Sequence, residues 1–409
     1  MALAAGTALR LWLAARQAAA ARGHRERVPA PFAQQVPLAD HRKAADYTVA
    51  RTRLGAWETL ADAVVVLALT LGGGIAAVDA TWRRAHWSEP WHGVAVVLSV
   101  LAIAAIAGVP FSLWRTFRIE AFFGFNRTTP KLYWIDRLKG LVLALALGVP
   151  LLLGALTLME RAGGLWWLYA WLAWLVVSLV LSWGWPIFIA PLFNRFAPLG
   201  DAELKARIEA LLARCGFASK GVFVVDSSRR TAHGNAYFTG VGRNKRIVFF
   251  DTLLECLGGA EVEAVLAHEL GHFRLRHVRQ RLLVSAAGSL AGLALLGWLA
   301  RHPWFYAGLG LPAPSAHGAL ILFLLVAPVF AFFVTPLAAS WSRRHEFAAD
   351  RFAAAHANAT DLAAALVKLY RDNATTLTPD RIASAFYDSH PPAIARIAEL
   401  RKLAEHAAP

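Results

Sequence analysis

The chain has 409 residues, of which 57% are hydrophobic and only 17% are charged, and its mean hydropathy is +0.45. Soluble domains carry roughly a quarter charged residues and disordered chains carry far fewer apolar ones, so both classes fit poorly. The formal net charge is +15, but nucleic-acid-binding proteins are rarely this apolar, and no basic motif is interleaved with aromatic residues. We therefore expect a polytopic membrane protein and no nucleic-acid partner.

The predicted membrane spans follow from apolar stretches of about 20 residues, the length that crosses a bilayer as a helix. Six stretches meet or nearly meet this requirement: Leu60–Val78, Val94–Leu113, Leu141–Met159, Leu165–Phe188, Leu282–Leu299 and Ala319–Ala339. A weaker candidate, Ala2–Ala21, is rich in Ala and Leu but contains Arg10 and Arg16. It fits a shortened span, an interfacial helix or a signal peptide. We interpret it as a first span, which gives seven in total.

The distribution of basic residues predicts the orientation of these spans. With seven spans, the segments on one side hold 36 Lys and Arg residues and those on the other side hold 4. Cytoplasmic loops collect Lys and Arg, and the rule is safest for the short loops, which agree here. The long loop between the fifth and sixth spans and the C-terminus are therefore predicted to be cytoplasmic.

The chain is predicted to divide into four parts. They are an N-terminal membrane region (1–193), a cytoplasmic metallopeptidase segment (194–281), two further spans (282–340) and a cytoplasmic helical segment (341–409). The cytoplasmic loop contains a predicted helix, two short β-branched strands and a second helix running into the next span: Asp201–Arg214, Gly221–Val225, Arg246–Phe250 and Glu261–Arg281. The tail is predicted to be helical in at least three pieces, broken at Asn358 and around His390-Pro391-Pro392.

The second of these helices carries the sequence His268-Glu269-Leu270-Gly271-His272. Residues four apart lie on one face of a helix, so His268 and His272 can present two imidazole nitrogens to one metal ion. Zinc suits two neutral imidazoles and a carboxylate, with a fourth position left for water. Glu269 lies beside the ligand face and can act as a general base toward that water. A surface helix with two histidines, or a non-catalytic metal site, is the alternative.

A candidate third ligand follows the last span. Glu346 and Asp350 are four residues apart on a predicted helix, so Glu346 can complete a site of two histidines and one glutamate. Asp350 can then accept a hydrogen bond from the other ring nitrogen of a ligating histidine. The same carboxylates can instead pair with Arg343, Arg344 or Arg351 on a solvated face, and spacing alone leaves both interpretations open. His345 is a rival ligand on a different helix face.

These residues carry a resemblance to the type I CAAX prenyl endopeptidases, which are integral-membrane zinc metallopeptidases. The resemblance rests on the His-Glu-Leu-Gly-His helix, on Ser-Arg-x-x-Glu-x-x-Ala-Asp at 342–350 and on the seven-span layout. Two further segments match, His233-Gly-Asn235-Ala-Tyr237-Phe and Ser389-His390-Pro391-Pro392 with Arg396. The likeness covers about Pro29 to Leu403. It implies a mainly α, polytopic membrane protein, with about seven transmembrane helices around a chamber and a cytoplasmic α+β zinc metallopeptidase domain.

The resemblance also assigns residue roles. It implies one Zn²⁺ per chain held by His268, His272 and Glu346, with Glu269 as the base and later the proton donor to the leaving amine. Asn235 corresponds to a residue near the substrate backbone, on an edge strand that pairs with the peptide. His390 corresponds to a histidine that stabilises the tetrahedral oxyanion. The ligands are expected to be held in place by a second layer of residues, Asp350, Arg343 and Arg396. On sequence alone, Asn235 reads as a turn residue and His390 as a cap before two prolines.

The expected partner is a peptide or protein substrate, together with membrane lipid, and the sequence gives no oligomeric state. In eukaryotic relatives the substrate is the C-terminal tripeptide after a prenylated cysteine. The Ala-, Leu- and Arg-rich composition resembles that of a high-GC bacterium, which places the chain in the inner membrane with its active site facing the cytoplasm. If the chain is eukaryotic, the expected location is the endoplasmic reticulum membrane instead of the bacterial inner membrane.

Two alternative functions stay open at this point. A quality-control metalloprotease that cuts damaged membrane proteins uses the same chemistry, although such proteins are usually shorter and have about four spans. A metal-binding transporter or receptor without hydrolysis would carry charged residues inside its spans, whereas these spans are almost free of them.

Overall fold

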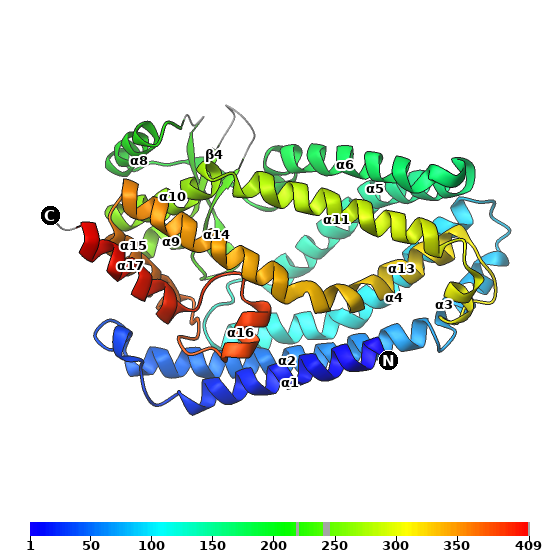
Figure 1. The fold of residues 1–409 in the computed structure, drawn as a ribbon, viewed down its shortest axis with the longest axis horizontal. Coiled ribbons are helices and arrows are strands. Elements are labelled where there is room, and N and C mark those ends of the chain that lie inside the picture. Colours follow the sequence, from blue (N-terminus) through cyan, green and yellow to red (C-terminus); the bar gives the residue numbers. More distant parts are fainter. Residues whose placement is uncertain (218–220, 240–245, 408–409) are drawn as a thin grey trace.

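The computed structural model describes residues 1–217, 221–239 and 246–407, and this part of the chain forms long helices with one small sheet (Figure 1). The helices are α1 Ala2–Gly23, α2 Leu38–Leu69, α3 Gly74–Arg83, α4 Trp91–Trp114, α5 Pro130–Arg161, α6 Trp166–Gly184, α7 Ala190–Phe193, α8 Ala202–Arg214, α9 Asp251–Cys256, α10 Gly259–Arg274, α11 His277–Leu299, α12 Pro303–Ala307, α13 Ala316–Ala331, α14 Thr335–His356, α15 Ala359–Asp372, α16 Arg381–Tyr387 and α17 Ala393–Ala407. The strands are β1 Phe196–Pro198, β2 Val222–Val225, β3 Ala236–Thr239 and β4 Arg246–Phe250. Figure 1 shows α8, α10, α15 and α17 at one end of the long axis and α3 at the other.

Five helical stretches of the described chain are long and apolar enough to cross a membrane. They are Trp91–Glu120, Pro130–Arg161, Gly163–Phe193, His277–Leu299 and Ala316–His356. Each contains one of the predicted spans, which confirms a mainly helical, multi-pass architecture. Only 6% to 28% of the most apolar window of each stretch is buried inside the protein. The spans therefore do not pack into a tight bundle.

The predicted span Leu60–Val78 is bent rather than straight. It corresponds to the end of α2 and the start of α3, which pass the test for a span together and meet at 51°. Gly73 has φ of +74°, and a Cβ at Gly72 would lie 2.6 Å from the carbonyl oxygen of Ala68. The glycines permit the break, because other residues rarely adopt this conformation or fit this space. Counting the pair as one span gives six.

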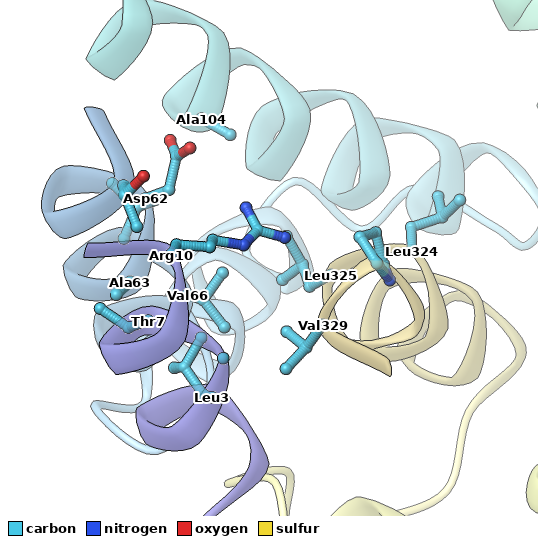
Figure 2. Close-up of a pocket in the computed structure, with 14 residues that line it drawn as sticks. Leu3, Thr7, Arg10, Asp62, Ala63, Val66, Ala104, Leu324, Leu325 and Val329 are labelled. Atoms are coloured by element: carbon cyan, nitrogen blue, oxygen red, sulfur yellow. The ribbon is translucent and has the colours of Figure 1, made fainter. Parts of the chain in front are cut away.

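The first helix, α1, packs along α2 and is not among these six, so its membrane crossing stays a prediction. Its Arg10 extends into a pocket of about 260 Å³ whose lining also includes Asp62 of α2 (Figure 2). The guanidinium carbon of Arg10 lies 4.2 Å from the centre of the Phe332 ring. The charge of Arg10, which weakens the apolar pattern of α1, thus contacts an aromatic ring inside the protein.

The sheet lies at the α10 end and has the strand order β1-β2-β4-β3. Strands β2 and β4 are parallel and correspond to the two predicted strands, whereas β1 and β3 add antiparallel edges. Helix α8 begins where its prediction placed it, since the side chain of Asp201 accepts a hydrogen bond from the backbone NH of Leu204 at 3.0 Å. The main core is formed by the inner faces of α8, α10, α15, α17 and the sheet.

One predicted element is divided in the structure. The helix expected over Glu261–Arg281 ends at Arg274 as α10, and α11 starts at His277. Arg276 between them has a left-handed backbone with φ of +60°. No Gly or Pro marks this break, so the periodic pattern continues through it. The tail is helical as predicted, with α14 and α15 separated at Asn358 and α17 starting after the two prolines.

Candidate metal centre

Helix α10 holds His268 and His272 one turn apart, and their Nε2 atoms are 3.2 Å apart. The opposite face of the helix is apolar and packs into the main core, which fixes the helix in place. Gly271 lies between the two histidines in the sequence and packs against α14. A Cβ there would lie 3.1 Å from the Cα of Ala349. The glycine therefore lets α14 approach closely enough to bring a third side chain to the histidines.

That side chain is Glu346 of α14, which is 2% exposed. Its two carboxylate oxygens each lie 3.4 Å from an Nε2 atom, Oε2 from His268 and Oε1 from His272. One ligand atom from each of the three residues lies within 4.8 Å of the other two. Two imidazoles and one carboxylate form the donor set of catalytic zinc sites. The residues present therefore fit a metal ion, and they come from segments about 75 residues apart.

A second layer of residues orients His268. Its Nδ1 atom lies 2.8 Å from Oδ1 of Asp350, which is fully buried. Arg396 of α17 donates two hydrogen bonds to the same carboxylate, both 2.7 Å long. The bidentate pair holds Asp350 in one orientation, and Asp350 in turn directs the Nε2 atom of His268 toward Glu346. Glu346 and Asp350 therefore form part of a buried network rather than a solvated face.

The environment sets the charge of the two histidines. Burial, together with the neighbouring His268, lowers the pKa of His272 to about 3, so His272 is neutral and its Nε2 is free to coordinate a cation. Burial and Arg396 also act to lower the pKa of His268. The hydrogen bond with Asp350 and the contact with Glu346 outweigh them, so the pKa of His268 lies above its usual value. The carboxylates thus make this site attractive to positive charge.

Glu269 follows His268 directly and is half-buried. Burial raises the pKa of its carboxyl group. A carboxylate whose pKa is raised from its ordinary value toward neutrality can both accept and return a proton. Its place beside the ligand face of α10 is the place that the sequence predicts for a general base.

The structure brings His390 to the same centre but places Asn235 and Arg343 at its edges. Nδ1 of His390 lies 2.7 Å from Oε2 of Glu346, and its side chain is 65% exposed. Arg343 donates a hydrogen bond of 2.7 Å to the backbone oxygen of Asp388, two residues before His390. Asn235 is exposed and directly precedes β3, the strand at the edge of the sheet beside α10.

The segment leading into β3 is fixed from two sides. Nδ1 of His233 lies 3.2 Å from the Asn373 side-chain oxygen, and Nε2 lies 3.5 Å from Glu120, which ends the π-helical turn after α4. The His233 ring also stacks on Phe125 with ring centres 4.4 Å apart. The membrane region therefore positions the edge strand, and sequence reasoning did not identify Glu120 or Phe125 because nothing local links them to His233.

Two further histidines border the centre. His277 begins α11, and its Nδ1 lies 3.0 Å from Nδ1 of His272. Its ring stacks on that of His345 at 3.9 Å. His345, the alternative ligand considered from the sequence, belongs to this stack and not to the group formed by His268, His272 and Glu346. His277 lies five residues after His272 and beyond the helix break at Arg276, so no helical spacing in the sequence identifies it.

A His-Glu-x-x-His helix, a glutamate from a second helix and a long-helix membrane region define a metallopeptidase embedded in a membrane. Comparison with known proteins gives its family. Residues 17–195 match the family model "CAAX prenyl protease N-terminal, five membrane helices", and residues 198–404 match "Peptidase family M48". The chain belongs to peptidase family M48 and is a metalloendopeptidase.

Individual relatives extend this match over nearly the whole chain. The CAAX prenyl protease 1 homolog of Arabidopsis thaliana is 36% identical, over 76% of this chain and 73% of its own length. The Mus musculus homolog is 32% identical, over 92% and 89%. The crystal structure of S. mikatae Ste24p superposes with a TM-score of 0.89 at 27% identity, covering 98% of this chain and 97% of that one. The fold and the membrane-protease class predicted from the sequence are confirmed.

Proposed function

We propose that the protein is a zinc-dependent membrane endopeptidase, with one Zn²⁺ per chain held by His268, His272 and Glu346. The observation that carries the proposal is the convergence of the three ligand atoms within 4.8 Å, beside Glu269. The family is metal-dependent, and two imidazoles with one carboxylate favour zinc. Asp350 and Arg396 would hold His268 in the orientation that ligation needs.

The residues around the centre have separate tasks in peptide hydrolysis. When bound, zinc supplies a Lewis acid that polarises the scissile carbonyl and makes water more acidic. Glu269 takes the proton from the attacking water and later passes it to the leaving amine. Strand β3 pairs with the substrate backbone, with Asn235 at the point where this pairing begins. His390 donates a hydrogen bond to the oxyanion, and Arg343 holds the segment that carries it.

The catalytic unit would combine two segments of the chain. Helix α10 from 194–281 packs against α14, which begins at Thr335 and continues into 341–409, and against α15 from 341–409. The membrane regions 1–193 and 282–340 precede and separate these two segments. With seven spans, 36 basic residues would lie on the side of the catalytic segments and 4 on the other side, which supports a centre on the cytoplasmic face of the membrane. For a bacterial chain this is the inner membrane.

We further propose that the substrate is a C-terminal CAAX-type peptide with a lipidated cysteine. Two observations support this substrate. The relatives that match over most of the chain are named CAAX prenyl proteases. The spans also bury at most 28% of their most apolar windows, which leaves apolar helix faces that other parts of the protein do not cover. Such faces can accept a prenyl chain and membrane lipid.

The test uses the full-length protein purified in detergent, with a farnesylated CAAX peptide and its unprenylated twin. We expect the farnesylated peptide to be cut just after the modified cysteine, at least tenfold faster than its twin. The Glu269→Gln variant should lose this activity while it retains its zinc, and Glu263→Gln on the same helix is the matched control. Undiminished activity in Glu269→Gln or after zinc removal would refute the mechanism. Equal cleavage of the two peptides would refute the lipidated substrate and favour a quality-control protease.

A further inference from the structure

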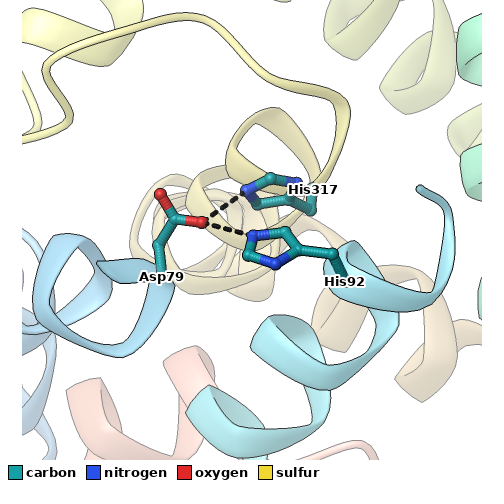
Figure 3. A group of neighbouring side chains, drawn as sticks. All are labelled: Asp79, His92 and His317. Atoms are coloured by element: carbon teal, nitrogen blue, oxygen red, sulfur yellow. Dashed lines mark hydrogen bonds and ion pairs between the residues drawn. The ribbon is translucent and has the colours of Figure 1, made fainter. Parts of the chain in front are cut away.

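A second group of two histidines and one carboxylate lies at the end of the molecule remote from α10 (Figure 1). Asp79 belongs to α3, His92 to the first turn of α4 and His317 to the first turn of α13. Figure 3 shows both imidazole rings turned toward the Asp79 carboxylate. One ligand atom from each residue lies within 4.8 Å of the other two, as in the group on α10 and α14.

Both histidines direct Nε2 toward the same oxygen. Oδ1 of Asp79 lies 2.7 Å from Nε2 of His92 and 3.4 Å from Nε2 of His317. The other oxygen of Asp79, Oδ2, accepts a hydrogen bond of 2.7 Å from Arg83 one turn along α3. Arg83 therefore contacts Oδ2 from the solvent side, while Oδ1 is directed at the histidines.

A further carboxylate faces the other side of His317. Oε1 of Glu89 lies 3.4 Å from Nδ1 of His317, while Oε2 of Glu89 accepts a hydrogen bond of 3.1 Å from the backbone NH of Gly93. A carboxylate at Nδ1 favours the tautomer with the proton on Nδ1, which leaves the lone pair of Nε2 pointing at Asp79. This is the arrangement that surrounds metal-ligating histidines.

The protein builds this group into a close helix contact. The side chains of His92 and His317 are 8% and 7% exposed. Gly93 allows the approach of α4 to α13, because a Cβ there would lie 3.1 Å from the Cβ of His317 and 3.0 Å from Leu156. Asp79 is 14% exposed and Glu89 is 41% exposed, so the group is open to solvent on the carboxylate side. An ion can reach it from there.

A hydrogen-bond network without metal accounts for only part of this geometry. His92 is satisfied by its contact of 2.7 Å with Asp79. Both nitrogens of His317 are 3.4 Å from carboxylate oxygens, longer than the 2.7–3.2 Å of an ordinary N–H···O bond, in a ring that is more than nine-tenths buried. A buried imidazole with long contacts on both sides is costly. A cation between the two Nε2 atoms and Oδ1 would satisfy all three groups.

We propose that Asp79, His92 and His317 form a second metal site, which binds a divalent transition ion of the zinc type and completes its coordination with water. Two imidazoles and a carboxylate favour zinc, cobalt or nickel over the oxygen-seeking calcium and magnesium. The site joins the consecutive helices α3 and α4 to α13, which lies more than 200 residues later in the chain, and so fixes the ends of the helices remote from the peptidase centre. It is structural and does not depend on the proposed peptidase function.

Metal content distinguishes the two sites. In zinc-saturated full-length protein freed of loosely bound metal, we expect two zinc ions per chain by mass spectrometry. The double variant His268→Ala/His272→Ala should retain one, and His92→Asn/His317→Asn should also retain one. His86→Asn is the matched control, because His86 is exposed at the same end and its φ of +55° suits asparagine. One zinc per chain in the wild type, or a content that His92→Asn/His317→Asn leaves unchanged, would overturn the proposal.

A second measurement covers the case in which His92→Asn/His317→Asn does not fold. Cobalt is added to the His268→Ala/His272→Ala variant, which keeps the remote group intact. We expect one equivalent of Co²⁺ to produce a visible absorption band typical of tetrahedral nitrogen and oxygen ligation, with a rise in the melting temperature. A protein that takes up no cobalt and shows no band would overturn the proposal even without the remote-site variant.

Discussion

Two groups with the same donor atoms lie at opposite ends of this molecule, and their surroundings differ. In each, two imidazole nitrogens and a carboxylate converge, and a further carboxylate faces Nδ1 of one histidine. Asp350 is fully buried and paired with buried Arg396, whereas Glu89 is 41% exposed. The α10 end also has Glu269 next to His268, and the edge strand β3 nearby. We therefore expect the donor set to determine metal binding, and the base and strand beside it to determine catalysis.

The largest difference between the two ends should appear when the candidate base is removed. We expect Glu269→Gln to lower kcat by about 10³-fold, because general-base catalysis contributes roughly 10²–10⁴-fold. Metal content should stay at the wild-type value, since the three ligands are intact. The measurement is steady-state cleavage of a CAAX peptide, with zinc content determined on the same sample. Glu263→Gln, a change on the same helix, is the control and should keep nearly full activity.

The next effect concerns the residue that orients His268. We expect Asp350→Asn to weaken metal binding at the α10 end by about 10–100-fold, because residues that hold a ligating histidine contribute that much to affinity. An amide at this position also removes the charged partner closest to the buried Arg396 and leaves it Glu346 at 3.8 Å. Competition with a chelator of known affinity measures the change. Asp361→Asn, near the start of α15, controls for loss of a carboxylate in the same segment, and equal affinities in both variants would contradict the prediction.

The corresponding change at the remote end should be smaller. We expect Glu89→Gln to weaken metal binding there by about threefold to tenfold, less than the usual range, because Glu89 is partly exposed and 3.4 Å from His317. Titration of the His268→Ala/His272→Ala variant with Co²⁺ isolates this site. Glu160→Gln removes a carboxylate at the same end and separates loss of charge from loss of orientation. If Glu89→Gln matched Asp350→Asn in effect, burial would not explain the difference between the ends.

The two ends also differ in how far the sequence predicted them. At the α10 end, local patterns predicted that His268 and His272 share one helix face and that Glu346 and Asp350 share another, although spacing alone left the partners of the two carboxylates open. Apolar length was sufficient for five spans. The group formed by Asp79, His92 and His317 comes from three separate elements, and no spacing rule connects them. Tertiary packing alone brings them together, and Gly93 permits that packing.

The errors at element boundaries have physical causes as well. The break between α10 and α11 has no Gly or Pro. Arg276 adopts a left-handed conformation there, which nothing in the local sequence predicts. Strands β1 (Phe-Ala-Pro) and β3 (Ala-Tyr-Phe-Thr) are short and lack the valine and isoleucine residues that mark β2 and β4, and they form by pairing with those two strands. By contrast, the bend after α2 falls at Gly72–Gly74, where the sequence does mark a weak point.

The smallest expected effect concerns Arg83, which contacts Asp79 at the remote end. It tests whether Arg83 orients Asp79 for metal binding as Arg396 is expected to orient Asp350. Arg83 is 66% exposed and pairs with Asp79 one turn away, so Arg83→Gln should cost only about 0.3–0.5 kcal/mol of stability. Loss of the guanidinium removes a positive charge beside Asp79 and makes the electrostatic potential at the site more negative. Metal affinity should therefore stay equal or rise slightly. Thermal melting with and without zinc measures both quantities, and Arg84→Gln is the neighbouring control. A large loss of metal binding in Arg83→Gln would mean that this exposed arginine fixes Asp79 as firmly as the buried one fixes Asp350.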